Sequence, residues 1–429
     1  MASSYSHLAV TITLESPLAL GERKPGGQAV APLDYLPGGR LRGALAELLL
    51  DEGPGPEHSG PGPAGATGDL FARLFAGDRP AIFRDALPGA SRVVSELLPA
   101  TAVSCKRHAG FRSAPGRGVR HGVFDTLLDR AFLETLKPAG LLYRPRCAQR
   151  DCPEWAERFA GYYGVRAAGI TRSFFTVDVP RRLLARVALD RRRRVAADEL
   201  LYTVPVLSEG TPNEEDEETS RPTVLHGAVL IPNGVSVAPV AEALARVDHL
   251  GGGGSRGLGA VRIETAPARE PDMSLAARLE RFRGAVARRR EQYARLAPLS
   301  VASLEGAYFS IDLRSDALLR RRGWQPTTVL DADLLRAATG VDDPSLALVR
   351  AYAEPDWRGG WQAAWGLPRP TELVARRGSC YLYRTANLAA WAPALEALEA
   401  TGIGARTAEG YGEVRVCDPF HLVLREDAV

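Results

Sequence analysis

The segment APVAEAL at residues 238–244 and the segment GLGAVRI at residues 257–263 decide the fold, because the chain carries each of them twice. The first recurs as APALEAL at residues 392–398, and the second recurs as GYGEVRV at residues 410–416. The offsets are 154 residues (392 − 238) and 153 residues (410 − 257), so both matches belong to one register with a single gap. Each copy predicts a helix, a glycine-rich loop and a strand. A repeat this long indicates a duplicated domain rather than a solenoid.

A strand is predicted at the start of each copy. VTITLES at residues 10–16 and FSIDLRS at residues 309–315 alternate apolar and polar side chains, which is typical of a strand with one buried face. Residues 270–296, rich in Arg, Ala, Glu and Leu, predict a helix between the copies. Strands with helices on one face of an antiparallel sheet form an α+β fold, and we expect the ferredoxin-like (RRM-like) arrangement.

We therefore expect an N-terminal domain over residues 1–265, a helical connector over residues 266–300 and a C-terminal domain over residues 301–429. Residues of about 50–235 form a long insertion in the first domain. Within it we predict helices at residues 127–136 and 154–159 and a strand at residues 173–179. Two loops are predicted from their Gly, Pro and acidic composition, at residues 51–68 and 208–223.

The charge is nearly balanced in number but not in distribution. The 429 residues include 54 Lys and Arg, of which only Lys24, Lys106 and Lys137 are lysines, against 51 Asp and Glu. Glu209 and the run EEDEE at residues 214–218 concentrate acidic charge in one loop. The remainder is basic, as expected of a protein that binds a polyanion, although a GC-rich genome also enriches arginine.

Targeting signals and disulfides are not predicted. No run of 18 apolar residues occurs, and residues 1–6 are polar, so we expect a cytoplasmic protein with no membrane partner. Five cysteines are too few, and odd in number, for a disulfide framework.

The glycine-rich loops do not match a nucleotide-cofactor site. GGGSRG at residues 252–257 fits G-x-G-x-x-G, but it lies between a helix and a strand in the wrong order. Glycine instead allows a ligand to approach backbone N–H groups, and arginine binds phosphate. We predict RNA-phosphate contacts from the two loops, at Gly254, Arg256, Gly257 and Gly259 in the first and at Gly404, Arg406, Gly410 and Gly412 in the second. The alternative is that these loops are only tight connections.

A second signal lies near the N-terminus. SPLALG at residues 16–21 is followed by YLPGGRLRGAL at residues 35–45, where a Pro-Gly-Gly turn precedes a helix. Arg40 and Arg42 would then lie beside the free N–H groups of its first turn, which favour phosphate.

These motifs resemble those of the RAMP superfamily of CRISPR-associated proteins: a strand ending in S-P-L-x-x-G, then Y-L-P-G-x-x-L-R-G-A-L, then a terminal glycine-rich loop. GWQAAWGLPRP at residues 360–370 and GSCYLY at residues 378–383 also resemble RAMP segments. The resemblance is closest to the large two-domain subunit of type III-D effector complexes that caps the 5′ handle of the guide RNA. It implies two RRM-like domains, guide RNA as ligand, indirect contact with target RNA, and the large signature subunit and backbone RAMP subunits as partners.

Cys147 and Cys152 are spaced like a pair of zinc ligands, with Cys105 upstream. Either His121 or His108 would complete a structural zinc site that orders the insertion, and we favour His121. The alternative is three ordinary reduced cysteines.

Catalysis is not expected. No Ser/His/Asp grouping or HExxH motif is apparent, which favours a non-catalytic RNA-binding subunit. The alternative function is a metal-independent endoribonuclease that processes the guide precursor, with His121 as general base beside Arg120. For His121 itself, the competing roles are zinc ligand and phosphate contact.

Overall fold

The first strand of the chain, β1 (Tyr5–Leu14), is a central strand of an antiparallel sheet. The computed structural model describes residues 5–23, 30–51, 70–89, 93–112, 119–136, 143–168, 171–190, 192, 195–212, 220–269, 272–296, 304–362 and 366–424. β17 (Val261–Pro267) and β16 (Val224–Pro232) pair with β1 on either side, and β4 (Ile82–Phe83) and β5 (Leu87–Gly89) pair with β16.

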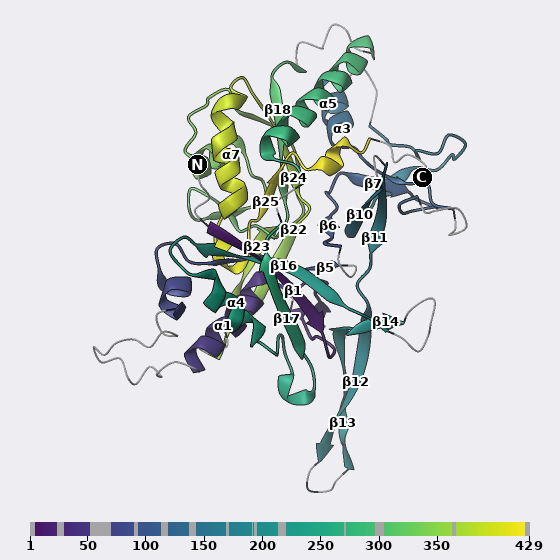
Figure 1. The fold of residues 1–429 in the computed structure, drawn as a ribbon. Coiled ribbons are helices and arrows are strands. Elements are labelled where there is room, and N and C mark those ends of the chain that lie inside the picture. Colours follow the sequence, from purple (N-terminus) through teal and green to yellow (C-terminus); the bar gives the residue numbers. More distant parts are fainter. Residues whose placement is uncertain are drawn as a thin grey trace.

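Alternating side chains give this first sheet one apolar face. Val10, Ile12 and Leu14 of β1 are buried, and their polar neighbours Thr11 and Thr13 point to the opposite face. The apolar face packs against α1 (Gly38–Asp51) and α4 (Val237–Ala245) in one hydrophobic core (Figure 1).

The second sheet has the same connectivity. It contains, in spatial order, β21 (Ala347–Tyr352), β24 (Cys380–Thr385), β18 (Ala307–Leu313) and β25 (Val414–Val416), all antiparallel. Its helices are α6 (Ala332–Thr339) and α7 (Leu388–Thr401). With the four main strands of each sheet numbered along the chain, both sheets have the order 4-1-3-2. The predicted α+β class is confirmed, and the sequence repeat corresponds to a repeated connectivity.

The second sheet is buried on both faces, which the alternation at residues 309–315 did not predict. α5 (Leu275–Leu296) and α3 (Leu127–Leu136) share its core, so Phe282 and Phe132 pack in the same cluster as Phe309. Ser310 and Asp312, expected to face solvent, are buried. The Ser310 hydroxyl donates to Asp312 Oδ2 (2.9 Å), and the His421 imidazole lies 2.7 Å from Asp312 Oδ1. Buried side chains therefore supply the hydrogen bonds that water would otherwise make to Ser310 and Asp312.

The residues between β5 and β16 form small sheets and a projecting hairpin. β11 (Thr171–Val177), β10 (Tyr162–Ala168) and β6 (Glu96–Leu97) make one sheet, and β8 (Val123–Asp125), β7 (Ala102–Cys105) and β9 (Ala156–Arg158) make another. β12 (Arg181–Asp190) and β13 (Val195–Leu207) form a long hairpin that extends away from the body (Figure 1). β4, β5 and β16, although they lie within residues 50–235, belong to the first sheet.

The remaining strands form two-stranded hairpins. They are β2 (Gly21–Arg23) with β3 (Val30–Pro32), β14 (Gly210–Pro212) with β15 (Ser220–Pro222), β19 (Leu319–Arg321) with β20 (Gln325–Thr327), and β22 (Pro355–Gln362) with β23 (Leu367–Ala375). Short helical turns occur at η2 (Ala72–Ala76), η3 (Gly254–Arg256), η6 (Thr407–Glu409) and η7 (Pro419–Leu422). Across the described ranges, every helix falls short of the combined length and hydropathy that spanning a bilayer requires.

Of the two helices predicted between residues 127 and 159, the structure contains one. The helix predicted at residues 127–136 is confirmed as α3. The helix predicted at residues 154–159 is wrong, because β9 occupies its centre and pairs with β7. Tertiary pairing outweighs helix propensity in so short a segment. Residues 52–68 of the first predicted loop and the acidic run at residues 214–218 lie outside the described residues.

Candidate functional site

The first glycine-rich loop, residues 251–259, connects α4 to β17 and is closed by backbone hydrogen bonds. The Leu250 N–H donates to the Gly259 carbonyl (2.8 Å), and the Gly259 N–H donates to the Pro17 carbonyl (2.9 Å). Gly259 has a φ of 84°, and a Cβ there would lie 2.1 Å from the Leu250 carbonyl oxygen. Glycine is therefore required at the base of the loop, while residues 251–257 are all exposed.

The second glycine-rich loop, residues 402–412, has the same backbone arrangement. The Ile403 N–H donates to the Gly412 carbonyl, and the Gly412 N–H donates to the Asp316 carbonyl, both at 2.8 Å. In this alignment Gly259 corresponds to Gly412 (412 − 259 = 153) and Gly257 to Gly410 (410 − 257 = 153). Arg256 then corresponds to Glu409 (409 − 256 = 153), so the two predicted loop arginines are not at equivalent positions.

The second loop packs against the first sheet instead of facing solvent. Gly410 is buried, and a Cβ there would lie 2.7 Å from the Phe83 carbonyl oxygen and 2.9 Å from Asp85 Oδ1. Gly404 is exposed, but a Cβ on it would lie 2.5 Å from the Leu318 carbonyl oxygen. This loop is thus largely occupied by contacts within the chain.

Arg406 is held by carboxylates of its own half of the chain. Its guanidinium pairs with Glu409 (2.7 Å) and Glu372 (3.1 Å) and lies over the ring of Tyr411, 4.9 Å from the centroid. Burial would lower the pKa of Arg406, but the neighbouring Glu409 carboxylate outweighs it and raises that pKa above the ordinary value. A phosphate would have to compete with these ion pairs.

The start of α1, which the sequence predicts to bind phosphate, already makes contacts within the chain. The Gly38 N–H at the start of α1 donates to Asp85 Oδ1 (2.9 Å), and Gly39 lies against Glu409. Arg42 is half-buried, with its guanidinium 4.9 Å from the ring centroid of Phe75. Arg40 is exposed on the first turn.

The first loop has a different environment, because it lies beside the projecting hairpin β12–β13. Arg256 Nη1 donates to the Tyr202 hydroxyl (3.3 Å), and Arg186 Nη2 donates to the Arg256 carbonyl (3.3 Å). Tyr202 is 42% exposed, and Arg256 is also exposed. We call Arg186, Tyr202 and the loop at residues 251–257 the arm surface. It combines cationic, aromatic and glycine backbone groups on one exposed edge.

The structure brings the four predicted metal ligands together. Cys105 at the end of β7, His121 before β8, and Cys147 and Cys152 in the loop before β9 place their ligand atoms within 4.8 Å of one another. The Cys105 and Cys152 sulfurs are 3.9 Å apart, and His121 Nδ1 lies 3.2 Å from the Cys147 sulfur. We call these four residues the Cys3His cluster.

The geometry fits a tetrahedral metal ion. Zinc–sulfur bonds of about 2.3 Å place two sulfurs about 3.8 Å apart across a tetrahedron. The N–H groups of His108 and Gln149 lie 3.4 Å from the sulfurs of Cys105 and Cys147, where they stabilise thiolates. His108 is a neighbour and not a member of the cluster, with its ring centroid 4.4 Å from that of His121.

The protonation states also suit metal binding. Burial lowers the pKa of His121, helped by His108 and Arg112, which keeps its imidazole neutral. Burial opposes ionisation of Cys105, but backbone hydrogen bonds, first that of His108, outweigh it and lower the pKa of this thiol. Burial and the two neighbouring thiols raise the pKa of Cys147 to about 12. Three crowded thiols do not all ionise unless a cation neutralises them.

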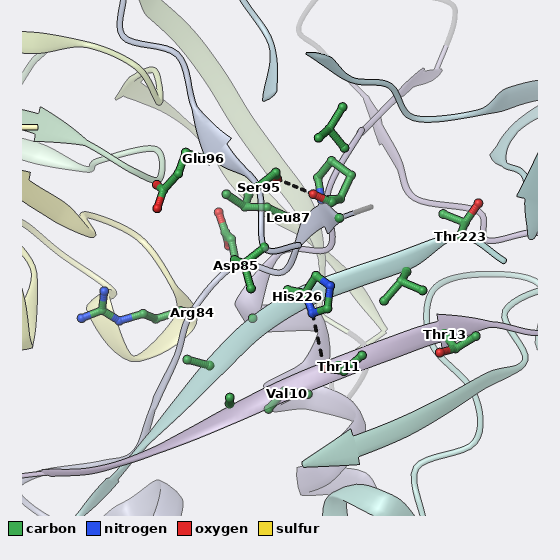
Figure 2. Close-up of a pocket in the computed structure, with 18 of the residues that line it drawn as sticks. Val10, Thr11, Thr13, Arg84, Asp85, Leu87, Ser95, Glu96, Thr223 and His226 are labelled. Atoms are coloured by element: carbon green, nitrogen blue, oxygen red, sulfur yellow. Dashed lines mark hydrogen bonds between the residues drawn. The ribbon is translucent and has the colours of Figure 1, made fainter. Parts of the chain in front are cut away.

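Sequence reasoning missed a large groove on the helix-free face of the first sheet (Figure 2). It has a volume of about 1280 Å³, and its floor includes Thr11 and Thr13 of β1 and His226 of β16. His226 Nδ1 lies 3.3 Å from the Thr11 hydroxyl. The alternation of β1 could have indicated the open face. Nothing in the sequence indicated that β10 and β11 form a wall of the groove.

Comparison with solved structures gives distant matches, three of which are described below. No protein-family model matches the chain, and no curated protein matches it. A chain of the type III-B Cmr-beta complex bound to cognate target RNA and AMPPnP is 12% identical, with a TM-score of 0.33, over 87% of this chain and 86% of that chain. A chain of the Cmr-beta apo state is 13% identical, with a TM-score of 0.29, over 61% and 97%. A chain of a type IV-B CRISPR complex is 13% identical, with a TM-score of 0.23, over 63% and 93%. These scores are too low to establish a shared fold or function.

Proposed function

We propose that this chain is a non-catalytic RNA-binding subunit of a type III CRISPR effector complex that binds the repeat-derived 5′ handle of guide RNA. The observation that carries the proposal is the arm surface, where Arg256 and Arg186 lie beside the exposed ring of Tyr202. Single-stranded RNA is bound by cationic groups along its backbone and by planar side chains on which bases stack. The RAMP-like motifs in the sequence supply the CRISPR assignment.

We also propose that each sheet with its two helices is a ferredoxin-like RAMP domain. The antiparallel 4-1-3-2 strand order of both sheets supports this assignment. The domains would span residues 1–265 and 301–429, joined by the connector at residues 266–300 that contains α5.

The two glycine-rich loops would then have different roles. The first loop, with Gly254, Arg256 and Gly257 exposed, would contact the RNA backbone. The second loop would join the two domains through Gly410, which lies against Phe83 and Asp85 of the first domain. The partners would be guide RNA and neighbouring effector subunits, and the arm surface would be available to both.

A structural zinc ion would occupy the Cys3His cluster. All four ligands come from protein side chains, which leaves no open coordination position for catalysis. The role of His121 as a ligand also argues against its use as the base of a ribonuclease, since Nδ1 faces the Cys147 sulfur.

Replacing Arg256 by glutamine is expected to weaken binding of repeat-derived single-stranded RNA about tenfold and to reduce the log–log salt slope by about one, because one phosphate contact is lost. Arg281→Gln is the matched control, since Arg281 is exposed and its helix α5 lies at the opposite end of the molecule from the β12–β13 hairpin (Figure 1). Fluorescence anisotropy at several salt concentrations measures both quantities. Wild-type protein that does not bind this RNA, or an Arg256→Gln variant with an unchanged slope, would contradict the proposal.

A further inference from the structure

We infer that the groove on the open face of the first sheet is a second RNA site that holds a single-stranded segment with a base stacked on Arg166. This inference rests on the proposed function, and it assigns RNA contacts to residues outside both glycine-rich loops. Its occupant is the same class of ligand, single-stranded RNA, at a separate place on the chain.

The repeated fold shows that this face is open in one copy only. Thr11 and Thr13 of β1 correspond to Ser310 and Asp312 of β18 (310 − 11 = 312 − 13 = 299). Ser310 and Asp312 are buried under α5 and the turn that contains His421. Thr11 and Thr13 line the groove instead, and no residue of a described helix is among the lining residues. This face of the first sheet is therefore open, whereas α5 and the turn that contains His421 cover the corresponding face of the second sheet.

The walls carry cationic groups that have no carboxylate partner in the described part of the chain. Arg166 of β10, Arg221 of β15 and Arg269 after β17 are exposed and line the groove. Among the described residues, no carboxylate forms an ion pair with any of the three. Asp178 and Glu264 are also on the lining. At the other end, Arg84 pairs with Glu413 and Arg314 with Glu96. The lining as a whole is balanced, with five arginines and five carboxylate side chains, so the exposed arginines without a carboxylate partner, and not a net charge, are what suits an anionic segment.

One wall presents a platform for a base. The guanidinium of Arg166 lies over the ring of Phe175, 4.5 Å from its centroid. An exposed guanidinium beside an aromatic ring can stack on a planar base, a recurrent mode of single-strand recognition. Figure 2 shows His226 and Thr11 on the floor of the groove, where imidazole and hydroxyl groups can hydrogen-bond base edges.

The dimensions favour a polymer over a small metabolite. Small-molecule pockets hold about 300–1000 Å³, and this groove of about 1280 Å³ exceeds that range. Exposed arginines beside a floor of hydroxyl groups suit the phosphates and base edges of RNA, and RNA is the occupant to which the inference commits.

Two substitutions at Arg166 separate stacking from charge. Arg166→Lys keeps the charge but loses the planar group, so affinity for fluorescein-labelled oligouridylate should fall about fivefold or more with an unchanged salt slope. Arg166→Gln should lower the affinity and also reduce the slope by about one. Arg269→Gln should reduce the slope without removing the platform. Arg281→Gln should match wild type, and the oligouridylate–oligoadenylate duplex should bind more weakly than the single strand.

Several results would overturn the inference. If the Arg166 and Arg269 variants bind oligouridylate like Arg281→Gln while Arg256→Gln binds it weakly, the groove is not an RNA site and the proposed function stands. If Arg166→Lys is fully equivalent to wild type, no base stacks on Arg166. If wild type binds no single-stranded RNA, the proposed function fails together with the groove. Phe175 packs against a hydrophobic cluster, so replacing it would disturb the fold. The test therefore replaces the exposed arginines instead. Thermal unfolding of each variant checks that it is folded.

Discussion

Replacing Cys147 by serine is expected to remove zinc from the protein and to unfold the region from β7 to β9. The four ligands come from three separate segments: the end of β7, the turn before β8 and the loop before β9. Apart from α3, the described chain around these ligands is ordered by two short ladders of three residue pairs each. Structural zinc contributes an apparent binding free energy of about 10–16 kcal/mol in isolated zinc modules, so losing one ligand should exceed the effect of an ordinary core substitution.

Elemental analysis of untagged protein and hydrogen exchange of residues 102–158 measure the outcome. Wild type should contain about one zinc per chain, and Cys147→Ser should contain much less and exchange faster in this region. His108→Ala is the matched control, because the His108 ring lies beside that of His121 without entering the cluster. Zinc well below one equivalent in wild type, or an unchanged content in Cys147→Ser, would exclude the metal site.

Replacing His421 by glutamine is expected to destabilise the protein by about 3–5 kcal/mol, the usual cost of breaking a buried ion pair by removing one partner. His421 is fully buried between two carboxylates, with Nε2 2.7 Å from Asp312 Oδ1 and Nδ1 3.1 Å from Asp125 Oδ2. Asp125 precedes α3, and Asp312 lies on β18, so one imidazolium joins the inserted region to the second sheet.

The same contact predicts a dependence on pH. Burial alone would lower the pKa of His421, but the carboxylates of Asp312 and Asp125 outweigh it and hold that pKa well above the ordinary value. A group whose pKa is raised on folding contributes stability that is complete below its unfolded pKa of about 6.5. This contribution should be lost as the pH rises through the folded-state pKa.

Denaturant unfolding from neutral to alkaline pH measures both effects. Wild type should lose more stability than His421→Gln across that range, because the variant has no imidazolium to lose. Adding Asp125→Asn to His421→Gln should recover part of the stability, since it removes one uncompensated carboxylate. A His421→Gln protein as stable as wild type at neutral pH would refute the charged contact.

Some features of the fold were predictable from local pattern. The repeat at residues 238–263 and 392–416 predicted helix, loop and strand in both copies, and the structure has α4 and α7 there, followed by β17 and β25. The metal cluster was predictable because ligand chemistry restricts the residue types and their spacing. The length of α3 was predictable from its apolar periodicity.

Other features depend on long-range packing that local pattern does not encode. Residues 10–16 and 309–315 alternate in the same way, yet only the second strand is covered on its polar face, by segments distant in sequence. Likewise the two glycine-rich loops have similar sequences, but only the second meets the start of α1. The arginine at position 406 was predicted as a phosphate ligand because its partner Glu372 lies in another hairpin, β22–β23.

Ultraviolet cross-linking of the effector complex purified from its native cells, with mass spectrometry of the linked peptides, tests the central claim most directly. The claim is that this chain contacts the 5′ handle of guide RNA through the arm surface. Cross-links should join repeat-derived nucleotides to peptides that contain Tyr202 or residues 251–259. A complex that contains guide RNA but yields no cross-link to this chain, or yields cross-links only on α5, would contradict the account.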